Sequence, residues 1–372
     1  MSSKENSSVD EATVNKMRHI FRKQVVAIRD ARKTVKELSD NPVGSSLANF
    51  NLDKFWNDYS IIAQLISHNV TKLSVVLTSS SCPTSGVSGI QSIVDESHLA
   101  LSNLVNLNAS MPFNVGHQYC QYLSSTSQRI IDSLEDYFMV IFRKPLSASQ
   151  AGSVGVVWES CCLDDVARTP KDYCTKVLRG QHELVLDAAS ELDDEVKTQR
   201  LMTNSHAVMS AIPEETWSRT QTERAEAVLA ITNIVAEIVG KAADSNNTSD
   251  ESWLGCSPSL LDTVVEAALL ISSSVDDLVA STYSPIHAQP LQSLVTGVKE
   301  IISKLLNSIG EAGREAGSTW SNWADAEKLK LATACDNLSQ KLHSDLTSTS
   351  DLPHLVQEQF TINEDNDQAN NE

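Results

Sequence analysis

The sequence of 372 residues predicts an all-α protein, folded as two up-and-down antiparallel helical bundles with about ten helices in total. Three observations lead to this class. Long segments repeat apolar residues at steps of three and four, which places one apolar stripe along each helix. No alternation of apolar and polar residues lasts long enough to predict a strand. The segments between the helical patterns are mostly short, which favours antiparallel neighbours.

Five helices are expected in a first bundle that covers residues 10–165, after a polar segment 1–9 that we expect to be disordered. Each helix has a recognisable start or stop. Asn41-Pro42 ends the first helix, Asn51 is suited to cap the second, and Pro112 opens the fourth. The expected ranges are about 10–39, 51–78, 88–108, 112–144 and 154–165. In the last of these helices Val157 and Trp158 are expected to face the core, and the helix could belong to either bundle.

A second, acidic bundle is expected over residues 166–346, followed by a disordered acidic and polar tail over 347–372. Its clearest element is 257–285, where Ser257 is suited to cap the helix and Pro258 fits the first turn. Val264, Ile271, Val275 and Leu278 belong to its apolar stripe, and a proline at 285 blocks continuation. The other helices are expected from Pro170 to about 205, from Pro213 with Glu214-Glu215, from about 291 to glycines 310, 313 and 317, and over about 318–346. Leu184 is expected in the apolar stripe of the helix that starts at Pro170.

The charge is unevenly distributed along the chain, whose net charge is −19. Residues 1–165 carry 14 Lys or Arg and 16 Asp or Glu, whereas residues 166–372 carry 15 and 32. A negative field of this size repels phosphate backbones, so we expect no direct binding of nucleic acid through the second half. A basic partner is more compatible with this negative second half than a nucleic acid is.

The composition favours an intracellular protein. The N-terminus is polar and lacks the apolar core of a signal peptide, and no apolar run is long enough for a membrane span. Seven scattered cysteines suit reduced thiols better than a disulfide framework.

The sequence contains no recognisable catalytic motif, and we expect no catalytic residue, cofactor or metal. Gly-rich phosphate loops, HExxH, GxSxG and CxxC are absent. His117 and Cys120 lie one turn apart but lack further ligands. We expect Cys161-Cys162 to be one core and one boundary thiol. We expect the acidic runs Asp276-Asp277 and 193–195 to be solvated surface.

The first helix carries a basic face, and Arg22, Lys23, Arg29 and Lys33 are the candidate partner-binding residues. Three interpretations remain open. The face is a solvated bundle surface by default, or it binds an acidic partner or lipid headgroups. Groove-reading DNA recognition is disfavoured, because the apolar stripe of Val14, Met17 and Phe21 runs through the basic run.

Several motifs together resemble the cyclin-D-binding protein family, also described as Grap-adaptor and cyclin-D-interacting proteins or helix-loop-helix regulators lacking a basic region. They are Phe55-Trp56 opening a long helix, Val157-Trp158 followed by Cys161 and Pro170-x-Asp172, and Ser274-Val-Asp-Asp-Leu278 with Ser281, Tyr283 and Pro285. The resemblance covers roughly residues 50–310 and rests on order and spacing.

The resemblance implies a non-enzymatic, all-α regulator that moves between cytoplasm and nucleus. Such a protein would bind a D-type cyclin, and helix-loop-helix transcription factors or signalling adaptors, and would restrain cell-cycle progression and transcription. A homodimer remains open. The alternative is a cytoskeletal or adhesion adaptor of the vinculin, catenin or talin-rod type, since such proteins use similar bundles. An enzyme is disfavoured because the apolar stripes are nearly free of Asp, Glu and His.

Overall fold

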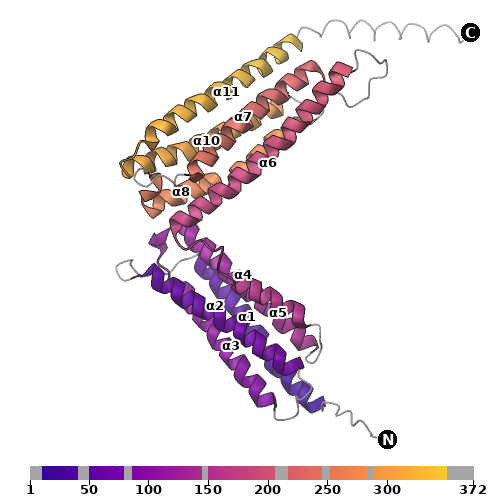
Figure 1. The fold of residues 1–372 in the computed structure, drawn as a ribbon, viewed down its shortest axis with the longest axis vertical. Helices are drawn as coiled ribbons and strands as arrows, with labels where there is room; N and C mark the ends of the chain where they lie inside the picture. Colours follow the sequence, from indigo (N-terminus) through magenta and orange to yellow (C-terminus); the bar gives the residue numbers. More distant parts are fainter. Residues whose placement is uncertain are drawn as a thin grey trace, which may run out of the picture. The chain divides into compact units, whose positions relative to one another are not determined.

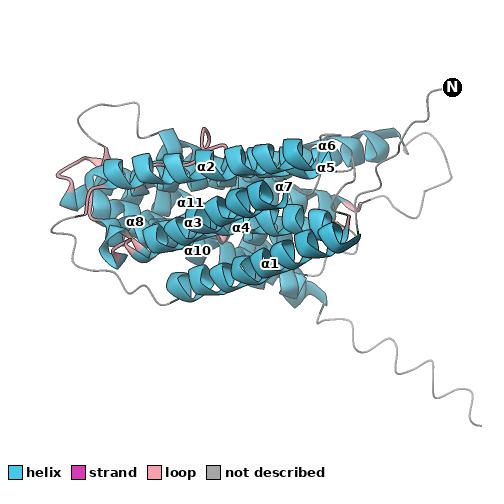
Figure 2. Ribbon diagram, turned by 90° about the horizontal axis from the view of Figure 1, so that it is seen from below, coloured by secondary structure: helices cyan, strands magenta, loops and turns pink. Residues whose placement is uncertain are grey.

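The computed structural model describes residues 11–40, 50–78, 86–144, 150–205, 217–244, 252–283 and 288–349. Within these ranges the regular structure is helical and no strand occurs, which confirms the predicted all-α class (Figures 1 and 2). The helices are α1 (Glu11–Asp40), α2 (Leu52–Thr78), α3 (Gly86–Ala109), α4 (His117–Arg143), α5 (Gln150–Cys161), α6 (Pro170–Ser205), α7 (Arg219–Ala243), α8 (Pro258–Ala268), α9 (Ile271–Ala280), α10 (Ala288–Glu315) and α11 (Trp320–Thr349), with short 3-10 turns at Phe113–Val115 and Trp253–Gly255.

The chain divides into two compact units, residues 1–173 and 174–372. The dividing point lies in the first turns of α6, a few residues after the boundary predicted at 165. Segments 1–9 and 350–372, both expected to be disordered, lie outside the described residues, and α11 extends to Thr349 rather than ending at 346. The antiparallel up-and-down arrangement stays a prediction.

The first unit is built around one shared core. Helix α1 packs against α3 and α4, α2 against α3 and α5, and α4 against α5. Helix α5 therefore belongs to this unit, a point that the sequence left open. By length and composition α2 is apolar enough to cross a membrane; ten of its side chains, among them Tyr59 and Leu73, are buried in the first unit.

Hydrogen bonds of an indole and two tyrosine hydroxyls hold the segment between α5 and α6 against this core. Trp56 of α2 donates from Nε1 to the carbonyl oxygen of Arg168 at 2.6 Å. The hydroxyl of Tyr119 donates to the carbonyl of Ala167 at 3.3 Å, and that of Tyr122 accepts from the Ala167 N–H at 3.0 Å. The motif Phe55-Trp56 thus has a structural role: it holds the connection that leads into α6.

A reciprocal cap starts α6. The Thr169 N–H donates to Asp172 Oδ2, and the Asp172 N–H donates to Thr169 Oγ1, both at 3.1 Å. Pro170 occupies the first helical position, where its missing N–H costs nothing. The motif Pro170-x-Asp172 is therefore a helix start.

Replacing Asp172 with alanine should remove one half of this cap and one negative charge from the helix N-terminus. We expect a loss of about 1 kcal/mol in the free energy of unfolding, measured by urea denaturation of the full chain. Lys171→Ala, one position earlier and outside the cap, is the control. Equal stabilities of the two variants would contradict this account of the helix start.

The predicted single helix over 257–285 is wrong, because the structure breaks it into α8 and α9 at the exposed residues Leu269 and Leu270. The N–H of Ser272, in the first turn of α9, donates to Oε1 of Gln181 in α6 at 2.9 Å. A helix start leaves such N–H groups without a partner in their own helix, and α6 supplies one here. The apolar stripe itself is confirmed, since Val264, Ile271, Val275 and Leu278 are all buried.

Helices α7 and α6 each differ from expectation in one respect. Helix α7 begins at Arg219, after a capping box in which the side chains of Ser218 and Gln221 each accept from the other residue's N–H; the predicted start at Pro213 lies outside the described residues. In α6, Leu178 and Val185 are buried while the predicted core residue Leu184 is 51% exposed. The predicted stripe of α6 is therefore out of phase at this point.

Helix α10 passes through two of the glycines expected to end it and stops near Gly317. This glycine has φ of 69°, in the left-handed region, and the Ser318 N–H donates to the Gly313 carbonyl at 2.8 Å. Together with the bond from the Gly317 N–H to the Arg314 carbonyl, this forms a Schellman cap. A Cβ at Gly313 would lie 2.8 Å from that of Trp320, so the glycine permits the close approach of α11.

Candidate partner-binding surface

The residues with potential for metal or redox chemistry do not converge. His117 lies near Gln121 on an exposed side of α4, whereas the buried Cys120 directs Sγ to the Pro112 carbonyl. Burial raises the pKa of the Cys161 thiol to about 12, so it is protonated at neutral pH and a poor nucleophile. Within the described ranges, no three His, Cys, Asp or Glu side chains are grouped to hold a metal ion.

The acidic runs singled out in the sequence lie on helix surfaces. Asp276 and Asp277 are exposed on α9, and Asp193 and Asp194 form ion pairs with Lys197 one turn away on α6. Their oxygens face solvent or a neighbouring lysine rather than a shared cavity.

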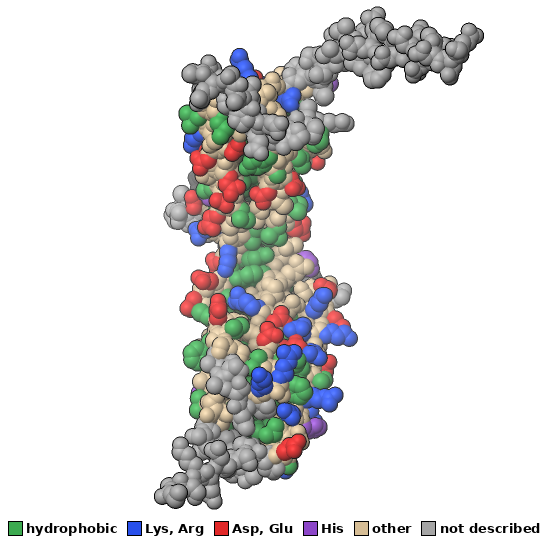
Figure 3. Space-filling model, turned by 90° about the vertical axis from the view of Figure 1, so that its right-hand side faces the viewer, with side chains coloured by type: hydrophobic (Ala, Val, Ile, Leu, Met, Phe, Trp, Pro, Cys, Tyr) green, Lys and Arg blue, Asp and Glu red, His purple; other side chains and the backbone are tan. Residues whose placement is uncertain are grey.

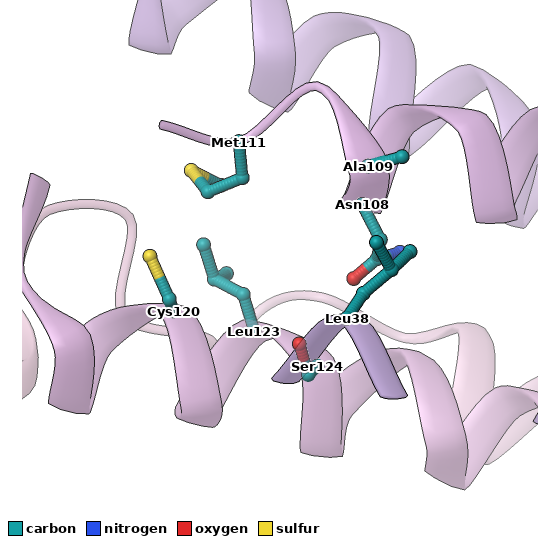
Figure 4. A pocket seen from close by; sticks show the side chains of 7 residues that line it. All are labelled: Leu38, Asn108, Ala109, Met111, Cys120, Leu123 and Ser124. Atoms are coloured by element: carbon teal, nitrogen blue, oxygen red, sulfur yellow. The ribbon is translucent and has the colours of Figure 1, made fainter. Parts of the chain in front are cut away.

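A small cavity at one end of the first unit offers no room for a substrate. Its volume is about 10 Å³, enough for a single water molecule. Figure 4 shows the side chains around it, which come from α1, the end of α3, the connection that follows α3 and the start of α4. They are Leu38, Asn108, Ala109, Met111, Cys120, Leu123 and Ser124.

The candidate basic residues of α1 are all exposed, but they do not form one line. At about 100° per residue, Arg22, Arg29 and Lys33 lie along one side of α1, opposite its buried side chains, and Lys23 is about 100° away. Arg18 and Lys36 extend the line in both directions. We call Arg18, Arg22, Arg29, Lys33 and Lys36 the basic stripe. In Figure 3, blue side chains gather over the first unit, in the lower half of the view.

Arg29 has a second role inside the first unit. Its Nε lies 2.8 Å from Oε1 of Glu135 in α4, and Arg32 Nη2 lies 2.6 Å from both Glu135 Oε2 and Asp132 Oδ1. The Glu135 side chain is only 9% exposed. Because a buried carboxylate needs a compensating charge, these two arginines hold α1 onto α4.

The remaining charges of the basic stripe are more available. Lys33 has only a 3.7 Å contact with Glu37 on the same exposed face, which contributes little. Among the described residues, no ion pair involves Arg18, Arg22 or Lys23. The structure therefore separates the four predicted residues into Arg29, engaged with Glu135, and three side chains that point to solvent.

Two large apolar side chains of the first unit are exposed, and one of them was expected in the core. Val26, 53% exposed, lies next to the basic stripe, and Trp158 of α5 is 54% exposed although the sequence placed it inside. The buried positions Val154 and Val157 of α5 set its phase, and Trp158 lies about 100° from Val157. The Trp158 Nε1 donates to Thr71 Oγ1 at 2.9 Å, which ties the ring to α2.

Comparison with known proteins gives a consistent result. Residues 60–198 match the model of the family described as Grap2 and cyclin-D-interacting, N-terminal. The chain is 23% identical over 310 residues to the cyclin-D1-binding protein 1 homolog of Xenopus laevis, which covers 78% of this chain and 91% of that protein. It is 22% identical over 285 residues to cyclin-D1-binding protein 1 of Bos taurus, covering 70% and 74% of the two chains. The Danio rerio homolog is 22% identical over 344 residues, covering 87% and 94%.

Proposed function

We propose that this chain, which belongs to the cyclin-D-binding protein family, acts without catalysis by binding a D-type cyclin through an exposed helix face. The observation that carries the proposal is the similarity, over most of the length of both chains, to proteins named for binding cyclin D1. The scattered placement of its ionisable side chains supports a binding role.

The basic stripe is the surface we assign to this binding. Its side chains are exposed on α1, so a partner can reach them without unfolding the unit. Charges at such a surface mainly accelerate association and select a partner with acidic residues.

The regulatory consequence follows from stoichiometric binding. A bound D-type cyclin is withdrawn from its kinase partner, which would restrain cell-cycle progression and the transcription that depends on it. Helix-loop-helix factors or signalling adaptors are further candidate partners, and action in both cytoplasm and nucleus belongs to the same proposal. A homodimer would be detected by light scattering of the purified chain.

The test is the affinity of the purified full chain for a purified D-type cyclin, measured by calorimetry. The variant Arg18→Glu, Arg22→Glu and Lys33→Glu should weaken binding at least about tenfold, because it reverses three exposed charges. Arg29 is kept in this variant because it compensates the buried Glu135. The thermal unfolding midpoint should stay unchanged.

The matched control reverses three other exposed charges of the chain, with Lys144→Glu, Arg168→Glu and Lys171→Glu. It should bind the cyclin like the original chain. If the stripe variant binds the cyclin with the same affinity as the control variant, the basic stripe is only a solvated surface. If the original chain binds filamentous actin and not the cyclin, the cytoskeletal adaptor replaces this proposal.

A further inference from the structure

Helices α6 and α9 lie side by side in the second unit and run in the same direction. Near the start of α9, the Ser272 N–H donates to Oε1 of Gln181 in α6 at 2.9 Å. Near the end of α9, partial burial and the carboxylates of Glu191 and Glu195 raise the pKa of Tyr283. Residue numbers therefore rise together along the two helices. Their neighbouring sides form one surface.

Several large apolar side chains of this surface face solvent. On α6, Leu184 is 51% exposed and Met202 is 42% exposed. Leu269, just before α9, and Tyr283, just after it, are 46% and 44% exposed. Scattered apolar side chains are ordinary on a surface, but here two lie on α6 and two flank the adjacent α9.

Acidic side chains lie between these apolar ones. Asp187, Glu191 and Glu195 follow Leu184 at steps of three and four, so they share its face of α6, and Asp276 is exposed on α9. The described structure gives no ion pair for Asp187, Glu191, Glu195 or Asp276. We call Leu184, Asp187, Glu191, Glu195, Met202, Leu269, Asp276 and Tyr283 the acidic face.

The nearest basic residues of α6 point elsewhere. Lys197 pairs with Asp193 at 2.6 Å, and Nη2 of Arg200 lies 2.5 Å from Glu226 of α7. Both lie well over 90° around α6 from Leu184. The negative charge of the acidic face is therefore not neutralised by the helix that carries most of it. Figure 3 shows the same imbalance more broadly, with more red than blue over the second unit.

We propose that the acidic face is a docking surface for a basic amphipathic helix of a partner protein. The apolar side chains contact the apolar stripe of such a helix, and the carboxylates, which have no ion pair among the described residues, select Lys and Arg along its edges. The length fits: residues 184–202 of α6 span about 27 Å, or five turns of a docked helix. This surface is separate from the basic stripe, and the proposal does not depend on cyclin binding.

A synthetic peptide of about 18 residues, built from Leu and Lys with helical spacing, is the probe. Its affinity for the full chain is measured by fluorescence anisotropy at low and at high salt. Glu191→Lys with Glu195→Lys should weaken binding at least about tenfold at low salt and flatten the salt dependence. Leu184→Ser, at an exposed position, should weaken it about threefold or more without changing the charge.

The control variant, Glu266→Lys with Glu300→Lys, changes the net charge equally at exposed positions of α8 and α10. It should bind the peptide like the original chain. A peptide of the same composition with its Leu and Lys order scrambled should bind at least about tenfold more weakly. Equal losses in the two double variants, or equal binding of the scrambled peptide, would show that only overall charge attracts the probe, and the proposal would be wrong. Because no cyclin is present, this result is independent of the proposed function.

Discussion

Replacing Leu278 with aspartate should unfold the second unit. The Leu278 side chain is fully buried in α9, and α9 packs against α7 and α10. An aspartate there would lose the apolar contacts and would bury a carboxylate for which this part of the core offers no partner. We expect a loss of more than about 4 kcal/mol in the free energy of unfolding, which exceeds the stability margin of many domains.

The measurement is thermal unfolding of the full chain followed by circular dichroism, with amide hydrogen exchange to locate the loss of protection. Ala280→Asp, at an exposed position of the same helix, is the control and should unfold like the original chain. Unchanged protection of α9 and α10 in the Leu278 variant would mean that the buried side of α9 has been misassigned.

Removing the two arginines that face Glu135 should strongly destabilise the first unit. Arg29→Met with Arg32→Met keeps the apolar length of both side chains and removes their charge. Glu135 would then lie almost buried without its compensating charges. We expect a loss of about 3 kcal/mol, near the lower end for a broken buried pair, because both arginines are about half exposed and solvent screens part of the interaction.

A third substitution separates lost charge compensation from lost packing. Adding Glu135→Gln to the double variant should restore more than half of the loss, because the carboxylate that needed a partner has gone. Urea denaturation of the original chain and these variants gives the comparison. Arg18→Met with Arg22→Met, at exposed positions without an ion pair among the described residues, should leave stability within about 0.5 kcal/mol. If the third substitution restores nothing, α1 is not held to α4 by charge.

Much of the fold could be predicted because helix patterns are local. Met17, Phe21 and Val25 repeat at steps of four, and all three are buried in α1. Pro170 at the start of α6 marks its boundary through the missing N–H, so the sequence alone places it correctly.

The exposure of single residues could not be predicted in the same way. Leu184 and Trp158 are apolar and lie within a residue of a buried position, so a pattern of steps three and four admits either phase. Which phase is buried depends on the neighbouring helices. For α5 those neighbours are α2 and α4, which lie outside the local pattern of α5.

The same distinction between local and long-range effects applies to the basic residues of α1. The exposure of Arg22, Lys23 and Lys33 follows from the polar side of α1, which the sequence shows directly. The engagement of Arg29 does not, because Glu135 lies 106 residues further along the chain. No periodicity within α1 distinguishes Arg29 from Arg22.

By itself, the sequence determined the helical class, most helix boundaries and the contrast between a near-neutral first half and an acidic second half. These properties depend on neighbours three or four residues apart and on composition. Only the tertiary structure decided the break between α8 and α9, where Gln181 binds the Ser272 N–H from 91 residues away. It likewise decided which cations are engaged and which apolar side chains face solvent, because those outcomes depend on contacts between helices that local spacing does not encode.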